Sequence, residues 1–371
     1  MNVKRLCVIN MKKTIKHYNM DNLISQNCDF NILFGERSNG KSYQLKHKRM
    51  IFNYLETGNR FILMRRFKEE ITASNIEQYF ADVDIHTITK GKYNCISVWR
   101  KQIFLSNFTD KGKIVRGEKI GYAVALSTEQ NYAGGSFLDV SDIIFEEFFT
   151  RSVFLKNEPS KLMNFYCTID RKKGTTKLWM CGNTISRVNP YIYEWGLHKI
   201  ISKQKQGTIE TIEIPSTDDD VVKLAIEYCE STGASSHTIG FNKDMMNDGS
   251  WQSEPQPKLP KSKKEYDVLF RIGFMFQSFK FLGELLIDKE NPNKLCWFIY
   301  PYEDEFNKKT LVITDRISTN NNYKRNIYDL TNVSDNINLL MNNTFREENI
   351  FYATDMCGTD FKQVIDFSIR R

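Results

Sequence analysis

The chain contains, at residues 35–42, the sequence Gly35-Glu36-Arg37-Ser38-Asn39-Gly40-Lys41-Ser42. It matches the pattern GxxxxGK followed by Ser or Thr at every defined position. The apolar run FNILF (30–34) before it predicts a strand, and a helical pattern follows from Lys41 to Tyr54. Glycines let a backbone wrap around phosphates with its N–H groups pointing inward. The sequence therefore predicts a phosphate-binding loop.

The loop residues have separate expected roles. Lys41 is expected to reach the β- and γ-phosphates of a nucleotide, and the Ser42 hydroxyl to bind magnesium. The neighbouring Tyr43 is included among the nucleotide-binding residues. ATP and Mg²⁺ are thus the predicted cofactors.

A second candidate site lies about 100 residues later, in the segment DIIFEEF (142–148), which agrees with the acidic group that a phosphate loop requires. Its apolar centre predicts a buried strand that ends in two glutamates. We assign Glu146, at a position where Asp is more usual, to magnesium, and Glu147 to polarising the attacking water. Asp142 is the competing candidate, but it begins the strand. A glutamate beside the magnesium carboxylate points to the additional-strand catalytic-glutamate (RecA-like) ATPases.

The order of patterns predicts an α/β fold with a mainly parallel sheet, because apolar runs alternate with helical patterns over the first 200 residues. A segment rich in Pro and Lys (250–265) has the composition of a linker, and consecutive antiparallel strands are expected from residue 267 onward. The further predicted elements are strands at 60–66, 142–148, 177–183, 296–301 and 310–315, short strands within 85–125, and helices at 67–80, 221–229 and 336–342.

These patterns divide the chain into a P-loop ATPase domain (1–205), a linker region (206–265) and a smaller α+β domain (266–371). A length of 371 residues agrees with two or three domains.

Composition excludes several classes of protein. With 41% hydrophobic and 13% aromatic residues, the chain is not intrinsically disordered. No apolar run approaches the roughly 20 residues of a membrane helix, and the N-terminal apolar run is too short for a signal peptide. The eight cysteines are scattered without a CxxC pair, which disfavours a zinc site. We expect a cytosolic protein with free thiols.

Charge is distributed unevenly along the chain. Residues 1–200 contain 31 Lys and Arg against 19 Asp and Glu, whereas the remainder is net acidic. A basic first half indicates contact with a polyanion such as nucleic acid, although a drift of charge for solubility alone explains it equally well.

Several segments occur in an order that resembles a known family: GERSNGKSY (35–43), FILMRRFKEEI (61–71), DVSDIIFEEF (139–148), LMNFY (162–166) and GNTISRVNPY (182–191). The chain resembles the double-stranded DNA packaging ATPases of small phi29-type tailed bacteriophages, which are relatives of terminase large subunits. The resemblance covers roughly residues 15–200.

The resemblance implies roles for three further residues. Arg37 lies inside the phosphate loop, where the family has an arginine. Arg171 falls where the family has an arginine finger that acts on the neighbouring subunit, with Lys172 and Lys173 as alternatives for that register. Asn183 matches the asparagine that senses the γ-phosphate.

The second domain is similar to the ribonuclease-H-like nuclease domain of terminases. Its first strand, LFRIGFMFQSF (269–279), contains no carboxylate, whereas two-metal cleavage needs several converging ones. The resemblance therefore implies a vestigial nuclease without activity. The remaining candidate carboxylates are Asp288, Asp315, Asp355, Asp360 and Asp366.

DNA-gripping residues are less clearly marked. The loop at 129–135 lacks the lysine that the family has there. The basic series Lys111, Lys113, Arg116 and Lys119 is the substitute candidate, and a solvated hairpin tip explains it at least as well.

The function implied is ATP-driven translocation of double-stranded viral DNA into a preformed procapsid. The implied partners are DNA, the portal of the procapsid, further copies of the chain in a ring (a pentamer by resemblance) and, as a further candidate, a scaffold RNA. The protein would work in the host cytoplasm, docked at the portal. The alternatives are a terminase large subunit with an active nuclease and a non-motor P-loop regulator that binds nucleic acid.

Overall fold

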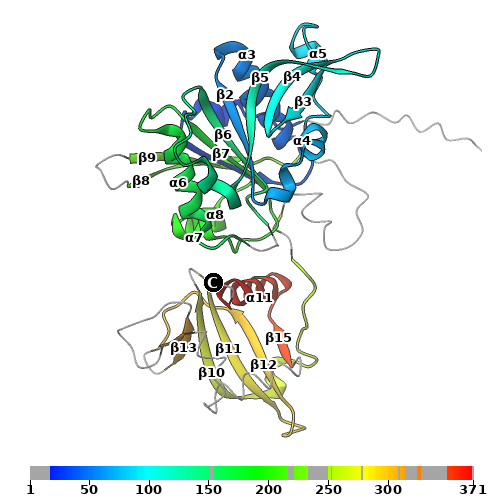
Figure 1. Ribbon diagram of the computed structural model, residues 1–371. Helices are drawn as coiled ribbons and strands as arrows, with labels where there is room; N and C mark the ends of the chain where they lie inside the picture. Colours follow the sequence, from blue (N-terminus) through cyan, green and yellow to red (C-terminus); the bar gives the residue numbers. More distant parts are fainter. Residues whose placement is uncertain are drawn as a thin grey trace, which may run out of the picture.

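The computed structural model describes residues 17–150, 154–215, 221–232, 250–251, 253–276, 279–307, 310–314, 324–326 and 349–369. They form two domains, each built around its own sheet (Figure 1). Helix α11 (Asp355–Ile369) of the second domain lies on the side that faces the first domain. No helix among these residues is long and apolar enough to cross a membrane.

The first domain contains a sheet of nine strands among the described residues, in the order β3-β4-β5-β2-β6-β7-β1-β9-β8. The six from β5 to β9 in this order pair in parallel, and an antiparallel strand or hairpin extends each edge. The strands are β1 (Phe30–Gly35), β2 (Arg60–Arg65), β3 (Cys95–Trp99), β4 (Gln102–Phe108), β5 (Ile114–Ala125), β6 (Val140–Glu146), β7 (Lys177–Asn183), β8 (Thr208–Pro215) and β9 (Val221–Tyr228). Strand β7 lies between β1 and β6, so one strand separates the two candidate site strands.

Helices connect the parallel strands. The helix expected after the phosphate loop is present as a continuous run of α2, the π-helical η1 and α3, which ends at Gly58 in the left-handed conformation. The helical elements of this domain are α1 (Asp21–Ser25), α2 (Lys41–Gln44), η1 (Leu45–Phe52), α3 (Asn53–Thr57), η2 (Lys68–Ile71), α4 (Ala73–Tyr79), α5 (Ile85–Ile88), η3 (Leu126–Tyr132), α6 (Glu158–Asp170), α7 (Pro190–Glu194) and α8 (His198–Lys203).

The sheet is buried on both faces, as expected for parallel strands. Phe30, Ile32 and Phe34 of β1 belong to the core that packs against α6 and α7, whereas Leu33 belongs to the opposite core beneath η1. This double burial explains why FNILF is a continuous apolar run.

One predicted element is wrong. Residues 221–229 were expected to form a helix, but Val221–Tyr228 is strand β9, paired in parallel with β1. Residues 224–228 are all buried, which a single helix face does not allow. Strands β8 and β9, within the region expected to be a linker (206–265), therefore belong to the first sheet.

The second domain has a sheet with the order β14-β13-β10-β11-β12-β15. Strands β10, β11 and β12 are antiparallel neighbours, as the sequence predicted, and β13 runs parallel to β10. Helix α11 packs on one face through Phe361 and Val364. The strands are β10 (Tyr266–Phe276), β11 (Phe279–Asp288), β12 (Leu295–Pro301), β13 (Leu311–Thr314), β14 (Lys324–Asn326) and β15 (Ile350–Tyr352), preceded by the short η4 (Lys263–Glu265).

The helix expected at 336–342 lies outside the described residues.

Candidate functional site

The phosphate loop joins the end of β1 to α2. Gly35, Ser38 and Gly40 have positive φ angles of 154°, 64° and 103°, so the backbone curls between strand and helix. Gly35 is also crowded, because a Cβ there would lie 3.2 Å from the carbonyl oxygen of Cys229. A side chain at this position would conflict with both the backbone angle and the neighbouring strand end.

Two side chains in the loop fit a bound phosphate. The Lys41 side chain is buried and donates from Nζ to Glu36 O at 2.5 Å and to Asn39 Oδ1 at 3.1 Å. Asn39 Nδ2 is buried and finds no hydrogen-bond partner among the described residues. Phosphate oxygens would supply acceptors to both groups. Arg37 and Ser38, in contrast, are exposed at the tip of the loop.

Ser42 and Glu146 meet although they are 104 residues apart: Ser42 Oγ donates to Glu146 Oε2 at 3.0 Å. Tyr79 Oη donates to the other carboxylate oxygen, Oε1, at 2.7 Å. Burial raises the pKa of the Glu146 carboxyl, an effect that both donated hydrogen bonds oppose. A hydroxyl and a carboxylate at one point are the oxygen ligands that Mg²⁺ prefers, so these residues fit the metal.

Glu147 lies just beyond the end of β6 in a strained conformation. Its φ is 57°, an angle that costs a non-glycine residue on the order of 1 kcal/mol. The conformation turns the side chain outward, where it is 59% exposed and accepts from Arg65 Nη2 at 2.7 Å. Arg65 also contacts Glu70, so the first of the two consecutive arginines restrains the predicted catalytic glutamate.

The second of these arginines, Arg66, has a different position. It forms a buried ion pair with Glu158, and its guanidinium donates to the carbonyl oxygens of Glu147 and Phe148 at 3.1 and 2.9 Å. Tyr191 Oη also donates to Glu158, at 3.0 Å. This network fixes the backbone that follows the acidic strand and thereby supports the conformation of Glu147.

Asn183, the expected γ-phosphate sensor, ends β7 and is the register partner of Gly35. The next residue, Thr184, donates its backbone N–H to Gly35 O at 3.2 Å. The structure therefore brings Asn183 to the phosphate loop.

The glutamate of the phosphate loop is held by residues that follow β9. The buried Glu36 carboxylate accepts from Ser231 Oγ at 2.6 Å and from Thr232 N and Oγ1 at 2.8 and 2.6 Å. Ser231 and Thr232 lie shortly after the end of β9 at Tyr228. The loop is thus joined to the chain segment that leads to the second domain.

Arg171 is not brought to the phosphate loop of its own chain. It follows α6, which runs back along the sheet from the end of β6, and its guanidinium donates to Gly135 O. Lys173 Nζ contacts Val140 O at the first residue of β6, whereas the loop follows the last residue of the parallel strand β1. The turn formed by Arg171, Lys172 and Lys173 therefore lies near the amino ends of the parallel strands. The phosphate loop lies at their carboxyl ends.

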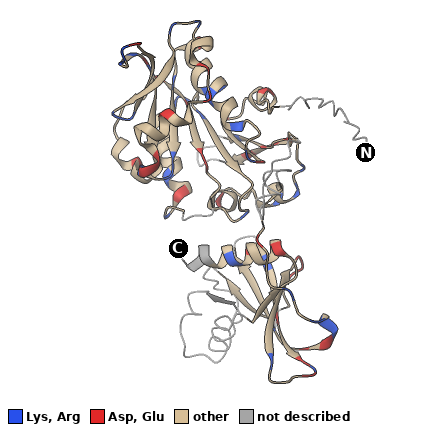
Figure 2. Cartoon of the chain, turned by 90° about the vertical axis from the view of Figure 1, so that its right-hand side faces the viewer, with Lys and Arg blue, Asp and Glu red and all other residues tan. Residues whose placement is uncertain are grey.

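The candidate DNA-contacting residues lie on the hairpin of β4 and β5. Lys111 and Lys113 are exposed at its turn, and Arg116 stacks 5.6 Å from the ring of Trp99. Lys119 Nζ donates to Tyr122 Oη at 3.1 Å. Figure 2 shows Lys and Arg (blue) and Asp and Glu (red) over both domains.

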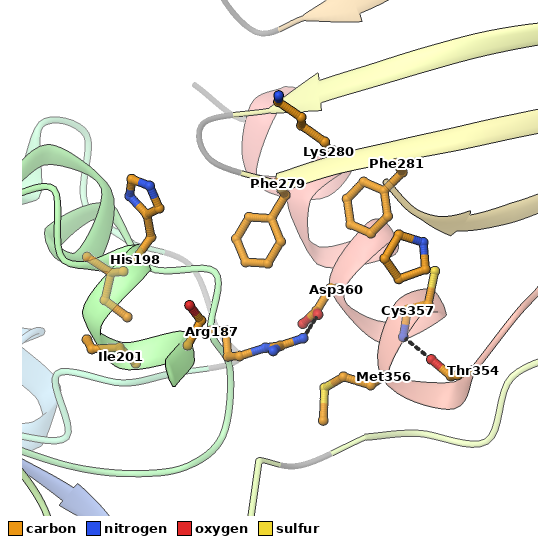
Figure 3. Close-up of a pocket in the computed structure, with 13 residues that line it drawn as sticks. Arg187, His198, Ile201, Phe279, Lys280, Phe281, Thr354, Met356, Cys357 and Asp360 are labelled. Atoms are coloured by element: carbon orange, nitrogen blue, oxygen red, sulfur yellow. Dashed lines mark hydrogen bonds and ion pairs between the residues drawn. The ribbon is translucent and has the colours of Figure 1, made fainter. Parts of the chain in front are cut away.

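The segment after β7 makes contacts between the two domains. Arg187 pairs with the buried Asp360 of α11, and Ser186 Oγ donates to Gln363 Oε1 at 2.5 Å. Val188 packs into the core of the second domain. Figure 3 shows Arg187 directed at Asp360, beside a cavity of about 250 Å³ lined by residues of both domains.

The candidate nuclease carboxylates have other partners where the structure describes them. Asp288, Asp355 and Asp360 pair with Lys261, Lys258 and Arg187, respectively. Within the described ranges, no three His, Cys, Asp or Glu residues come together as a metal site. Asp315 and the side chain of Asp366 lie outside the description.

Sequence reasoning missed Tyr79 and Glu158, which support the two acidic residues from other elements. Each lies in a helix whose pattern explains its residues without a role at the site. The sequence signal for such partners is the pair Arg65 and Arg66, because two adjacent cations at a strand end favour carboxylates nearby.

The chain matches a known protein family and several known proteins. The family described as "Podovirus DNA encapsidation protein (Gp16)" matches residues 11–351. The DNA packaging proteins of Bacillus phages phi29 and B103 are each 29% identical to the chain, over 211 and 206 residues. These alignments cover 54% and 53% of this chain and 57% of each relative, so the chain spans a little over half the length of the curated relatives it matches.

A solved structure, "The bacteriophage Phi-29 viral genome packaging motor assembly", contains a chain with the same fold. It is 19% identical, with a TM-score of 0.53, and the alignment covers 95% of this chain and 99% of that one. The family match and the two curated relatives confirm the resemblance to phi29-type packaging proteins.

Proposed function

The chain belongs to the podovirus DNA encapsidation protein family, and on this premise we propose that it is an ATP hydrolase that drives double-stranded viral DNA into a preformed procapsid. One observation carries the proposal. At the carboxyl ends of the parallel strands, the structure brings together Lys41, Ser42 and Glu146, and Glu147 follows Glu146. Phosphate binding, metal binding and activation of water require these groups together.

The site residues would divide the chemistry as follows. Lys41 and the loop N–H groups would bind the β- and γ-phosphates, with Asn39 donating to a phosphate oxygen. Ser42 and Glu146 would hold Mg²⁺, which neutralises charge on the phosphates when bound. Glu147 would orient and polarise water once Arg65 releases its carboxylate, and Asn183 would sense the γ-phosphate.

The order of the strands supports a more specific fold class for each domain. A strand between β1 and β6 is the arrangement of additional-strand, RecA-like ATPases. Three antiparallel strands followed by one parallel to the first, as in β10 to β13, favour a ribonuclease-H-like second domain. The pairing of its carboxylates with Lys and Arg favours a vestigial nuclease.

We further propose that several copies form a ring, a pentamer by analogy with the family, docked at the procapsid portal in the host cytoplasm. Arg37 is exposed at the loop tip, where it is free to meet nucleotide or a neighbouring subunit. Lys111, Lys113, Arg116 and Lys119 are the proposed DNA contacts, and a scaffold RNA is a further candidate partner.

Two assays on one purified sample test this function. ATP hydrolysis, followed as phosphate release, should rise when linear double-stranded DNA is added. Plasmid incubated with protein and Mn²⁺ should stay intact on an agarose gel. ATP binding without turnover in either condition would support a non-motor regulator instead, and metal-dependent cutting would support a terminase with an active nuclease.

The two glutamates should give different defects. Glu147→Gln should bind ATP normally but hydrolyse it about 100-fold more slowly or worse, because a general base contributes that much. Glu146→Gln should weaken nucleotide binding only when magnesium is present. Nucleotide affinity with and without Mg²⁺, together with turnover, separates the two defects. The control is Glu69→Gln, which removes the charge of an exposed glutamate beside Glu70. Exchanged phenotypes would mean exchanged roles.

Arg171 should act on ATP bound by a neighbouring subunit, since it lies at the end of the strands that is opposite to its own phosphate loop. A guanidinium offers fixed, always-charged donors to the γ-phosphate in the transition state. Arg171→Ala should bind ATP nearly normally without hydrolysing it, whereas Lys172→Ala should stay active.

Mixing Arg171→Ala with Lys41→Ala should restore activity, because some interfaces then pair an intact loop with an intact arginine. If mixed rings form and remain inactive, Arg171 does not act between subunits.

A further inference from the structure

The carboxylate proposed to hold Mg²⁺ in this chain is a glutamate, which is one methylene longer than the more usual aspartate. The extra rotatable bond gives the carboxylate more positions, and ordering such a side chain costs conformational entropy. Glu146 is nevertheless held in one place: it is only 4% exposed, and both of its oxygens have donors. Ser42 engages Oε2 and Tyr79 engages Oε1.

Tyr79 is itself rigidly placed. It is the last residue of α4, and its backbone oxygen accepts from Lys46 Nζ at 2.7 Å. The same ammonium lies 4.7 Å from the centre of the Tyr79 ring and pairs with Asp82. Lys46 is buried in the helix that follows the phosphate loop, so the tyrosine is tied to the same helical run that carries Ser42.

Tyr79 also borders a cavity of about 360 Å³, which is lined by Tyr79, Arg65, Glu70 and parts of α4. The same residue thus lines this cavity and donates a hydrogen bond to the Glu146 carboxylate. Without its hydroxyl, Glu146 Oε1 would lose its donor in a buried site, and the side chain would be free to turn away from Ser42.

We propose that Tyr79 is a positioning residue for the divalent cation, holding the long Glu146 side chain so that Oε2 faces Ser42. This role rests on the proposed function, because it presupposes a metal–nucleotide complex at this site. Partners that orient a metal ligand typically contribute about 10- to 100-fold to metal affinity. Tyr79 does not touch the metal or the nucleotide in this role.

The test uses the full-length protein with a non-hydrolysable ATP analogue, and Mn²⁺ as the metal probe. Free Mn²⁺ is measured by electron paramagnetic resonance, which reports metal binding without turnover. Tyr79→Phe should weaken Mn²⁺ binding about tenfold while affinity for the analogue without metal stays within about twofold. Tyr54→Phe is the matched control, since it removes a phenol that donates to Glu118, on β5, and should change neither value.

A second background distinguishes positioning from packing. In Glu146→Asp the shorter carboxylate is drawn back from Tyr79, so adding Tyr79→Phe should change Mn²⁺ affinity by less than about twofold. An equal loss in both backgrounds would mean that the ring only supports the fold, and would overturn the role. Unchanged Mn²⁺ affinity in Tyr79→Phe would overturn it as well.

The wild-type protein separates this inference from the function beneath it. If wild type shows no Mn²⁺ binding with the analogue, the proposed ATPase function fails and the role of Tyr79 falls with it. If wild type binds Mn²⁺ and Tyr79→Phe binds it equally well, only the positioning role fails.

Discussion

Lys41→Ala protein is expected to hydrolyse ATP about 100-fold more slowly than wild type or worse, because the ammonium stabilises charge on the transferring phosphoryl group. The structure strengthens this expectation. Lys41 Nζ is buried and held by Glu36 O and Asn39 Oδ1, so it is positioned in the loop before a phosphate arrives. Steady-state phosphate release measures the loss.

The matched control is Lys48→Ala, on the same helical run. Lys48 pairs with Asp21 and Asn19 on the outside of the domain, so its loss should leave turnover unchanged. A Lys41→Ala protein that keeps more than about a tenth of wild-type turnover would contradict the assigned role.

Arg66→Met is expected to destabilise the first domain by about 3–5 kcal/mol, the typical cost of removing one partner from a buried ion pair. The Glu158 side chain is fully buried, and without Arg66 its charge would face only neutral donors such as Tyr191. Urea unfolding of the full chain, followed by circular dichroism, measures the shift of the first domain's transition.

Two comparisons decide whether the buried charge is the cause. Lys92→Ala breaks an exposed, solvent-screened pair with Glu118 and should shift the unfolding transition far less than Arg66→Met does. The double variant Arg66→Met with Glu158→Leu should recover part of the loss, because it leaves no unpaired charge. Losses that simply add would exclude a direct interaction between the two side chains.

The phosphate loop was predictable from the sequence because its chemistry is local. Lys41 and Ser42 are neighbours of the glycines that shape the loop, and one short strand and helix frame them. Glu146 was predictable for a related reason, since a buried strand that ends in acidic residues is a local pattern. The parallel pairing that brings them together is not local, and it required the resemblance or the structure.

The supporting residues could not be predicted in the same way. Arg65 and Arg66 are adjacent, yet one contacts the exposed Glu147 and the other the buried Glu158, because successive side chains at a strand end point to opposite sides. Nothing in a single sequence tells which arginine finds which carboxylate. Strand β9 was missed because its short apolar run fits a helix or a buried strand equally well, and only pairing with β1 decides.

The connections of the phosphate loop have a mechanical consequence. Gly35 O accepts a hydrogen bond from Thr184 N, shortly before the segment that contacts α11. The Glu36 carboxylate accepts hydrogen bonds from Ser231 and Thr232, which follow β9. Tension that pulls the second domain away from the first would therefore be transmitted to the nucleotide site through the segment that contains Ser186 and Arg187. Coupling free energies are reciprocal, so a load that alters nucleotide affinity is matched by a nucleotide-dependent force on the second domain. If the chain is a subunit of the proposed packaging motor, a stalled subunit would hold or release its nucleotide according to how hard the DNA resists.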